Sequence, residues 1–289
     1  MVAPGLGMVH GDLMDAHLHV WSPDRGRYPI DLARALVPPP DVAFTVDDLM
    51  RQASPHGVTR FNLIQISFYG IDNRCLLDVI ASNPSRFVGT AVIDPLVDRP
   101  DEAMAPLIEQ GIRAFRIHPR LSGQPASSWL KPSGYDRMFS FAAKHDVGMS
   151  CLIEPPGFAE IDRMCRRFPD APVLIDHLGR IGLDGEIREA DIDALCRLSE
   201  HDRVMVKISA FYALGKKQPP YLDLSELIRR VVQAFGAKRC MWGSDSPYQT
   251  HAPHTYGASL ELVRFHLGFL SAEEREQILD TTAATFFFR

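Results

Sequence analysis

Two histidines near the start of the chain have the spacing of residues on one face of a β-strand. His17 and His19 lie in the segment Asp15-Ala16-His17-Leu18-His19, within an apolar run. Because alternate strand residues point to the same side, the two imidazoles would face the same way and could bind one divalent metal ion. A pair of hydrogen-bonded core histidines is the alternative, and the spacing alone does not decide between them.

His177 and Asp245 are two further candidates, and each ends a later apolar run. We expect His177 to share the inward face of its strand with Val173 and Ile175, whereas Asp245 precedes a turn limited by Pro247. Taken alone, this histidine is explained by core packing and this aspartate by the capping of a turn. Beside a metal ion, the aspartate could bind the ion and accept a proton from water. All these residues end strands on the side where barrel enzymes do chemistry, so we expect one shared catalytic site.

The segment 112–118 predicts an arginine inside the same site. Alternation places Arg116 and His118 on one face of this strand. A cation inside a barrel mouth is costly unless it meets an anion. Its partner is either a substrate carboxylate, which suits the fork of a guanidinium group, or a protein carboxylate such as Glu154 on the next strand. Arg120 lies just beyond and would reach either the pocket or solvent.

Other polar residues and two long connections are expected around this pocket. Ser67 and Lys207 fall on inward faces, and Lys207 is expected to pair with a carboxylate rather than act as a catalytic amine. Residues 22–44 and 248–256 form unusually long connections after the first and last strands. Both would leave the carboxyl ends of strands, so we interpret them as pocket walls, with Tyr248 part of the second. Exposed connections without a role are the alternative.

Eight short apolar runs would form the frame that positions these residues. Each is rich in β-branched or large apolar side chains and is bounded by Gly, Pro or Asp, which is typical of strands. The runs are Leu13–Val20, Arg60–Ser67, Phe87–Asp94, Ile112–His118, Gly148–Glu154, Pro172–Leu178, Val204–Phe211 and Cys240–Asp245.

The segments between these runs carry helix signals. Thr45 is a predicted N-cap, and helices are predicted over Asp72–Ala81, Ser133–Lys144, Phe158–Phe168 and Asp223–Phe235. Alternating strands and helices imply parallel pairing, and eight such units predict an α/β fold of the closed (β/α)8 TIM-barrel type. An open doubly wound sheet is the alternative, but no Gly-rich phosphate loop follows any run. We expect a single domain over residues 1–289, with an irregular segment at 1–12.

Bulk composition excludes several classes of protein. The net charge of −5 argues against broad electrostatic binding to nucleic acid or to an anionic membrane. The five cysteines are scattered without a CxxC pair, so free thiols in a reducing compartment are expected. Neither a signal peptide nor a membrane-spanning run is visible, which makes the cytoplasm the default location. The absence of a G-x-S-x-G elbow or an activated cysteine disfavours a serine or cysteine hydrolase.

The strand-end motifs resemble those of the amidohydrolase superfamily. They are most similar to its amidohydrolase-2 branch, which includes lactonases of aromatic and sugar catabolism, the pyrone dicarboxylate type among them. The resemblance runs from about Asp15 to the last strand and continues more weakly to the C-terminus. It rests on residues 15–19, 65–67 with 70–73, 111–116, 175–180 and 242–247.

This resemblance implies a metal site and a water-activating group. His17 and His19 match the family's first histidine pair, and Asp245 matches the water-activating aspartate. One divalent ion, Zn or Mn, is then expected on these three residues. His177 matches a later strand histidine, which would act as a ligand or would polarise the substrate carbonyl group.

The resemblance also implies substrate contacts, and the chain departs from the pattern at two places. Arg116 matches an arginine that holds a substrate carboxylate, and Ser67 matches a substrate-contacting serine. Residues 211–213 lack the arginine that the pyrone dicarboxylate type carries there, and the turn after Asp245 lacks its histidine and asparagine. We therefore expect an anionic lactone of another kind, either of the muconolactone type or derived from a sugar.

The implied function is hydrolysis of this small-molecule lactone, and two alternatives remain open. A metal-dependent non-oxidative decarboxylase of aromatic or muconate-type acids would use a similar set of residues. A barrel that binds a ligand without converting it is the second alternative. Whether the chain forms a homo-oligomer is left open by the sequence.

Overall fold

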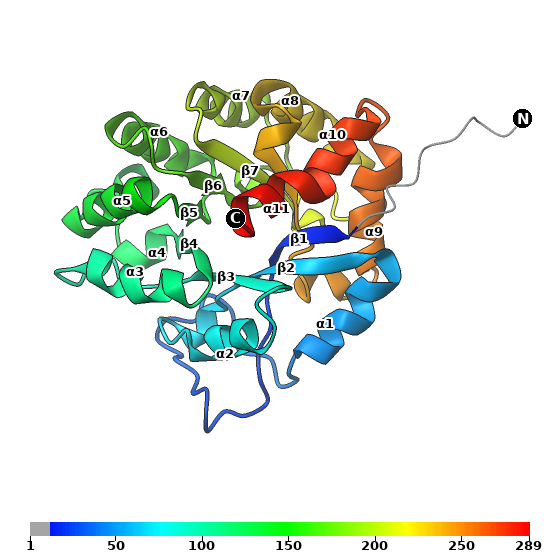
Figure 1. Ribbon diagram of the computed structural model, residues 1–289. Helices are drawn as coiled ribbons and strands as arrows, with labels where there is room; N and C mark the ends of the chain where they lie inside the picture. Colours follow the sequence, from blue (N-terminus) through cyan, green and yellow to red (C-terminus); the bar gives the residue numbers. More distant parts are fainter. Residues whose placement is uncertain (1–11) are drawn as a thin grey trace, which may run out of the picture.

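The computed structural model describes residues 12–289, in which eight parallel strands follow one another around a barrel (Figure 1). The expected irregular segment 1–12 therefore lies outside the described residues, except for its last residue. The strands are β1 (Leu13–Leu18), β2 (Val58–Ile64), β3 (Phe87–Ala91), β4 (Ile112–Ile117), β5 (Gly148–Cys151), β6 (Val173–Ile175), β7 (Val204–Ile208) and β8 (Cys240–Trp242).

Helices surround the strands, and the expected (β/α)8 fold is confirmed. Thr45 caps the first helix through a capping box with Asp48, as its sequence position predicts. The expected helices lie within two residues of observed ones at both ends. The α-helices are α1 (Val46–Ala53), α2 (Arg74–Ser82), α3 (Pro100–Glu109), α4 (Pro119–Ser122), α5 (Ser133–His145), α6 (Phe158–Arg167), α7 (Glu189–Arg197), α8 (Ser225–Phe235), α9 (Tyr256–Glu261), α10 (Ala272–Glu276) and α11 (Thr282–Phe287).

The chain following β8 returns to β1 and joins the two edges of the sheet. The backbone N–H of Asp245 donates to the carbonyl of His17 at 2.7 Å, and that of His19 donates to the carbonyl of Ser246 at 2.8 Å. Gly243 permits this approach, because a Cβ atom there would lie only 2.7 Å from the Cβ of His17. Barrel closure therefore brings the first and last predicted motifs together.

The amino end of the barrel is filled by the C-terminal helix α11. Phe286 and Phe287 pack against Met14 and Leu174, and the four side chains belong to one buried apolar cluster. Figure 1 shows α11 lying across the middle of the ring of strands. A second and larger apolar cluster fills the space between strands and surrounding helices. No helix within residues 12–289 is long and apolar enough to cross a membrane.

The strands are shorter than their apolar runs suggested, and the difference lies at the carboxyl ends. β6 ends at Ile175 and β8 at Trp242, so His177 and Asp245 both lie beyond the paired strands. The expectation that His177 belongs to the strand and shares its inward face with Val173 and Ile175 is therefore wrong. His177 has φ 55°, in the left-handed region, and this conformation ends the extended ladder.

Candidate active site

A cavity of about 720 Å³ opens at the carboxyl ends of the strands. The long connection after β1 supplies Leu36 and Val37 to its wall, and the connection after β8 supplies Tyr248, as expected for both segments. His17 is fully buried beneath it. The predicted site residues that line the cavity are His19, Ser67, Arg116, His118, Arg120, Glu154, His177, Asp245 and Tyr248.

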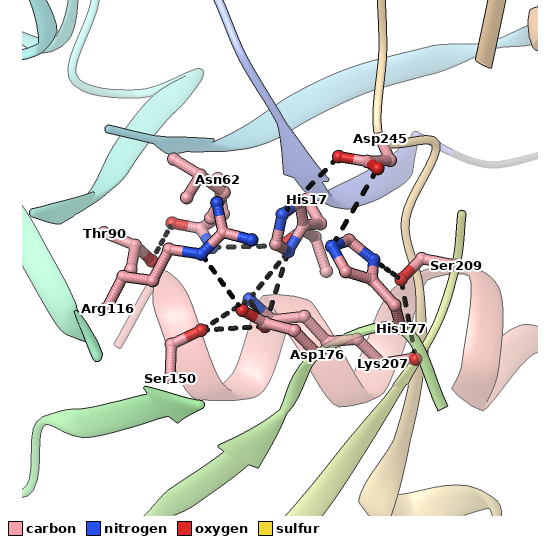
Figure 2. Close-up of polar contacts among 12 residues, drawn as sticks. His17, Asn62, Thr90, Arg116, Ser150, Asp176, His177, Lys207, Ser209 and Asp245 are labelled. Carbon is pink, nitrogen blue, oxygen red and sulfur yellow. Dashed lines mark hydrogen bonds and ion pairs between the residues drawn. The ribbon is translucent and has the colours of Figure 1, made fainter. Parts of the chain in front are cut away.

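Imidazole nitrogens surround the carboxylate of Asp245 at the floor of this cavity (Figure 2). Nε2 of His19 and Nε2 of His17 lie 3.3 and 3.7 Å from Oδ1 of Asp245. Nε2 of His177 lies 3.9 Å from Oδ2. One donor atom each from His17, His177 and Asp245 lie within 4.8 Å of one another, which is a spacing that a single metal ion can bridge.

The hydrogen bonds behind two of these histidines orient their rings. Nδ1 of His19 donates to the carbonyl of Ile64 at 2.9 Å. A carbonyl oxygen only accepts, so this bond fixes the ring with Nε2 facing the carboxylate of Asp245. On the other side, Nδ1 of His177 lies 2.8 Å from Oγ of Ser209. Such bonds on the far nitrogen are typical of metal-binding histidines.

These residues fit a divalent metal ion. Nε2 of His19 and Oδ1 of Asp245 lie 3.3 Å apart, so a nitrogen and an oxygen ligand atom are already side by side. Nε2 of His17 is buried and has no hydrogen-bond partner among the described residues, which leaves a polar atom to be satisfied. Nitrogen donors together with a carboxylate oxygen suit Zn²⁺ or Mn²⁺.

Left-handed backbone conformations place the groups that follow β6 and β8. His177, Leu178 and Arg180 have φ values of 55°, 53° and 54°, and Asp245 has φ 59°. Each such residue costs of order 1–3 kcal/mol and persists only where surrounding contacts enforce it. Gly179, between them, has φ 62°, and a Cβ atom there would lie 2.4 Å from the ring of Phe158. The turn at 176–180 therefore directs His177 into the cavity at a cost in backbone energy.

A buried network of charges lies directly beneath the histidines (Figure 2). Nζ of Lys207 is 3.0 Å from Oδ1 of Asp176 and 3.2 Å from Nδ1 of His17, and this nitrogen also lies 3.4 Å from the same Asp176 oxygen, which can accept its proton. Ser150 donates to the same Asp176 oxygen at 2.8 Å, and Nε of Arg116 lies 3.4 Å from Oδ2. Lys207 is thus an ion-pair partner, as expected. Asp176 was missed, although it directly precedes His177 and had the strand-end position of the other site residues.

Arg116 faces a protein carboxylate, which was one of the two alternatives, but Glu154 was the wrong example of it. Asp176 is the carboxylate next to Arg116, whereas Glu154 pairs with Arg180 at 3.1 Å between Oε1 and Nη1. Arg180 was quoted in its motif without a role, yet its side chain lines the cavity. Arg180 lies beyond β6 in left-handed backbone, so strand alternation could not predict that its side chain lines the cavity.

The remaining predicted contacts occupy the cavity wall. Oγ of Ser67 accepts a hydrogen bond from the backbone N–H of Leu36 at 3.0 Å, which ties the long connection after β1 to the cavity. His118 is buried and Arg120 is exposed near the mouth. The ring of Tyr248 meets that of His19 edge to face, with centroids 5.7 Å apart. All of these side chains line the cavity and can therefore contact a molecule bound in it.

Tyr212 is a second cavity residue that sequence reasoning missed. It follows β7 in the 3-10 helix η7 (Phe211–Ala213), and its hydroxyl group donates to Oδ2 of Asp245 at 2.9 Å. The sequence offered one signal for Tyr212: it lies in segment 211–213, which departs from the pyrone dicarboxylate type by lacking an arginine.

Burial sets the protonation states in the site. It lowers the pKa of His177 to about 4 and that of His118 to about 3, and it lowers the pKa of His17 well below its ordinary value. These imidazoles are therefore neutral at neutral pH, which is the form that binds metals. Burial alone would raise the pKa of Asp245, but His177 and the other histidines lower it below its usual range, so the carboxylate is ionised.

Comparison with known proteins identifies the family. The family model described as Amidohydrolase matches residues 14–289, so the chain belongs to this family. L-fucono-1,5-lactonase of Burkholderia ambifaria is 27% identical over 282 residues, covering 95% of this chain and 94% of that protein. 4-sulfomuconolactone hydrolase of Hydrogenophaga intermedia is 26% identical over 237 residues, covering 81% and 74%.

Solved structures share the fold. A probable 2-pyrone-4,6-dicarboxylic acid hydrolase of Acinetobacter baumannii with bound citric acid has a TM-score of 0.80 at 23% identity, covering 96% of this chain and all of that one (100%). An amidohydrolase of Burkholderia multivorans with bound zinc has a TM-score of 0.78 at 21% identity, covering 96% and 99%. A 2,6-dihydroxybenzoate decarboxylase from Rhizobium is more distant, with a TM-score of 0.65 at 13% identity, covering 96% and 99%.

Proposed function

We propose that this protein is a lactone hydrolase for a small, anionic lactone. The observation that carries the proposal is an ionised aspartate, Asp245, ringed by three histidines at the floor of a cavity whose wall holds three arginines. Two relatives that match over most of their length are named for the opening of lactones. Both observations point to attack of water on a ring ester.

The proposed cofactor is one divalent ion, Zn²⁺ or Mn²⁺, held by His17, His19 and Asp245. Nε2 of His177 would complete the set. The hydroxyl of Ser209 donates to the carbonyl of Lys207 at 3.5 Å, so it can accept the proton on Nδ1 of His177. Nε2 of His177 then keeps its lone pair for the ion. When bound, such an ion polarises a carbonyl group and lowers the pKa of water. The zinc in the structural neighbour from Burkholderia multivorans supports Zn²⁺ as the first ion to test.

Asp245 is the proposed general base and acid. Its carboxylate accepts a proton from water while the water oxygen forms a bond to the ring carbonyl carbon. As the tetrahedral intermediate collapses, the bond between this carbon and the ring oxygen breaks. Asp245 then returns the proton to the leaving ring oxygen, and the product is a hydroxy acid.

The arginines are proposed to orient the substrate. The Nε atom of Arg116 faces Asp176, and the side chain of Arg116 lines the cavity. Arg120 and Arg180 lie on the same cavity wall. A lactone with a carboxylate side group would be held by a guanidinium fork so that its carbonyl carbon faces Asp245. The hydroxyl groups of Ser67 and Tyr248 are proposed as further contacts.

The experiment that tests this proposal is a panel of lactones. Muconolactone-type and sugar-derived lactones are supplied to purified protein, acid release is recorded, and carbon dioxide is measured in parallel with aromatic acids. We expect acid release and no carbon dioxide. Carbon dioxide without lactone opening would instead favour a decarboxylase, the class named for the more distant structural neighbour from Rhizobium.

Asp245→Asn is the matched variant for the mechanism. Turnover is expected to fall by about 10²- to 10⁴-fold, the usual contribution of general acid–base catalysis. Asp184→Asn is the control, because Asp184 is an exposed carboxylate paired with Arg188. Circular dichroism of both variants checks the fold. Near-normal turnover in a folded Asp245→Asn protein contradicts the proposed proton transfer.

A further inference from the structure

The hydroxyl group of Tyr212 contacts the carboxylate of Asp245 at its Oδ2 atom. Ala210, with φ 58°, turns the chain after β7, and η7 then packs near the connection after β8. The backbone N–H of Tyr212 donates to Oε1 of the buried Gln249 at 3.3 Å. The Tyr212 ring also stacks on Tyr248, with centroids 6.4 Å apart and an interplanar angle of 23°. The position of its hydroxyl group is therefore fixed by contacts on several sides.

The two oxygens of Asp245 consequently have different partners. Oδ2 accepts a hydrogen bond from the Tyr212 hydroxyl at 2.9 Å, whereas Oδ1 faces the Nε2 atoms of His17 and His19. An ionised carboxylate only accepts, so the phenol is the donor.

We propose that Tyr212 is a positioning residue whose hydroxyl anchors Oδ2 of Asp245 and so holds Oδ1 toward His17 and His19. This inference rests on the role proposed for Asp245. A carboxylate held at one oxygen cannot rotate away from the histidines, so its free lone pairs keep the direction that proton transfer requires. Residues 211–213 contain no arginine, and this segment instead supplies a neutral donor to the carboxylate of Asp245.

Tyr212→Phe tests the proposal, because it removes the hydroxyl group and retains the ring that stacks on Tyr248. Groups that orient a metal-binding side chain usually contribute 10- to 100-fold, so kcat should fall by about this factor while KM stays near that of the unaltered protein. Zinc affinity, measured without substrate by competition with a chelator, should fall by about tenfold. In an Asp245→Asn background, the same change should leave zinc affinity unaltered, since its effect acts through Asp245.

Tyr28→Phe is the matched control. It also removes a hydroxyl bond to a carboxylate, that of Asp78 at 2.6 Å, and Tyr28 does not line the cavity. Both kcat and zinc affinity should remain unchanged in this variant. Thermal unfolding of both variants shows whether either has lost its fold.

Several outcomes overturn the proposal. Unchanged kcat and zinc affinity in Tyr212→Phe do so, and a large rise in KM with normal zinc affinity would assign Tyr212 to substrate contact instead. If the unaltered protein opens no lactone, the proposed function fails, and zinc affinity alone decides the role of Tyr212. If it also binds no zinc, a crystal structure of Tyr212→Phe decides: a rotated Asp245 carboxylate supports the proposal, and an unchanged carboxylate overturns it.

Discussion

The two ends of the barrel are built from different kinds of contact. At the amino end, α11 inserts Phe286 and Phe287 into an apolar cluster together with residues of β1, β6 and β8. At the carboxyl end, buried polar groups meet instead, and neither Lys207 nor Asp176 is exposed to solvent. Lys207 joins the two regions, because Nζ contacts Asp176 and lies 6.0 Å from the centroid of the Phe287 ring.

The two ends of the barrel also differ in backbone conformation. The left-handed residues His177, Leu178, Arg180, Ala210 and Asp245 all follow β6, β7 or β8 at their carboxyl ends, whereas Asp146 is a left-handed residue before the amino end of β5. Strained backbone and buried charge both cost stability, so the carboxyl end must be supported by the rest of the fold. We infer that the apolar amino end supplies stability while the carboxyl end supplies the chemistry, and this division can be tested.

The largest expected effect is on stability, at the amino end. Phe287→Ala should lower the free energy of unfolding by about 3–5 kcal/mol, because a fully buried ring leaves a cavity. Urea unfolding measures this change, and kcat at a temperature where the variant is folded should stay near that of the unaltered protein. Phe288→Ala, at a half-buried ring, should cost less. A large loss of kcat in folded Phe287→Ala would contradict the division between the ends.

The next effect is on substrate binding, at the carboxyl end. Arg180→Gln removes a cation from the cavity wall and leaves Glu154 without its partner. For an anionic lactone, KM should rise by about tenfold, equivalent to about 1.4 kcal/mol, whereas stability should hardly change since the pair is partly exposed. Arg188→Gln is the control, because Arg188 pairs with Asp184 outside the cavity. Equal KM values for the two variants would remove Arg180 from the substrate site.

A third effect is on the pH dependence of stability. Burial lowers the pKa of His118 from 6.5 to about 3, so the unfolded chain takes up a proton near pH 6.5 that the folded chain takes up only near pH 3. The stability present above pH 6.5 is therefore lost progressively as the pH falls between these values. His118→Gln should unfold at a lower pH than the unaltered protein in an acid titration followed by circular dichroism. His145→Gln, at an exposed position, is the control, and identical curves would contradict this role of His118.

Much of the site could be predicted from the sequence, because its residues lie next to apolar runs. His17, His19 and Asp245 were found from strand spacing and from their position at strand ends. Strand alternation located Arg116 and His118 as well, since β4 remains extended up to Ile117. Alternation failed at 176–180, where left-handed backbone replaces the strand, and it gave no information on which carboxylate would face Arg116.

By itself, the sequence determined the order of strands and helices, the barrel class and the residue types available for chemistry, because periodicity and turn residues act over short distances. Only the tertiary structure decided which groups meet. Asp176 rather than Glu154 faces Arg116, and Tyr212 reaches Asp245 from the neighbouring strand end. The physical reason is that hydrogen bonds and ion pairs depend on distances set by barrel closure, which joins segments that local patterns leave separate.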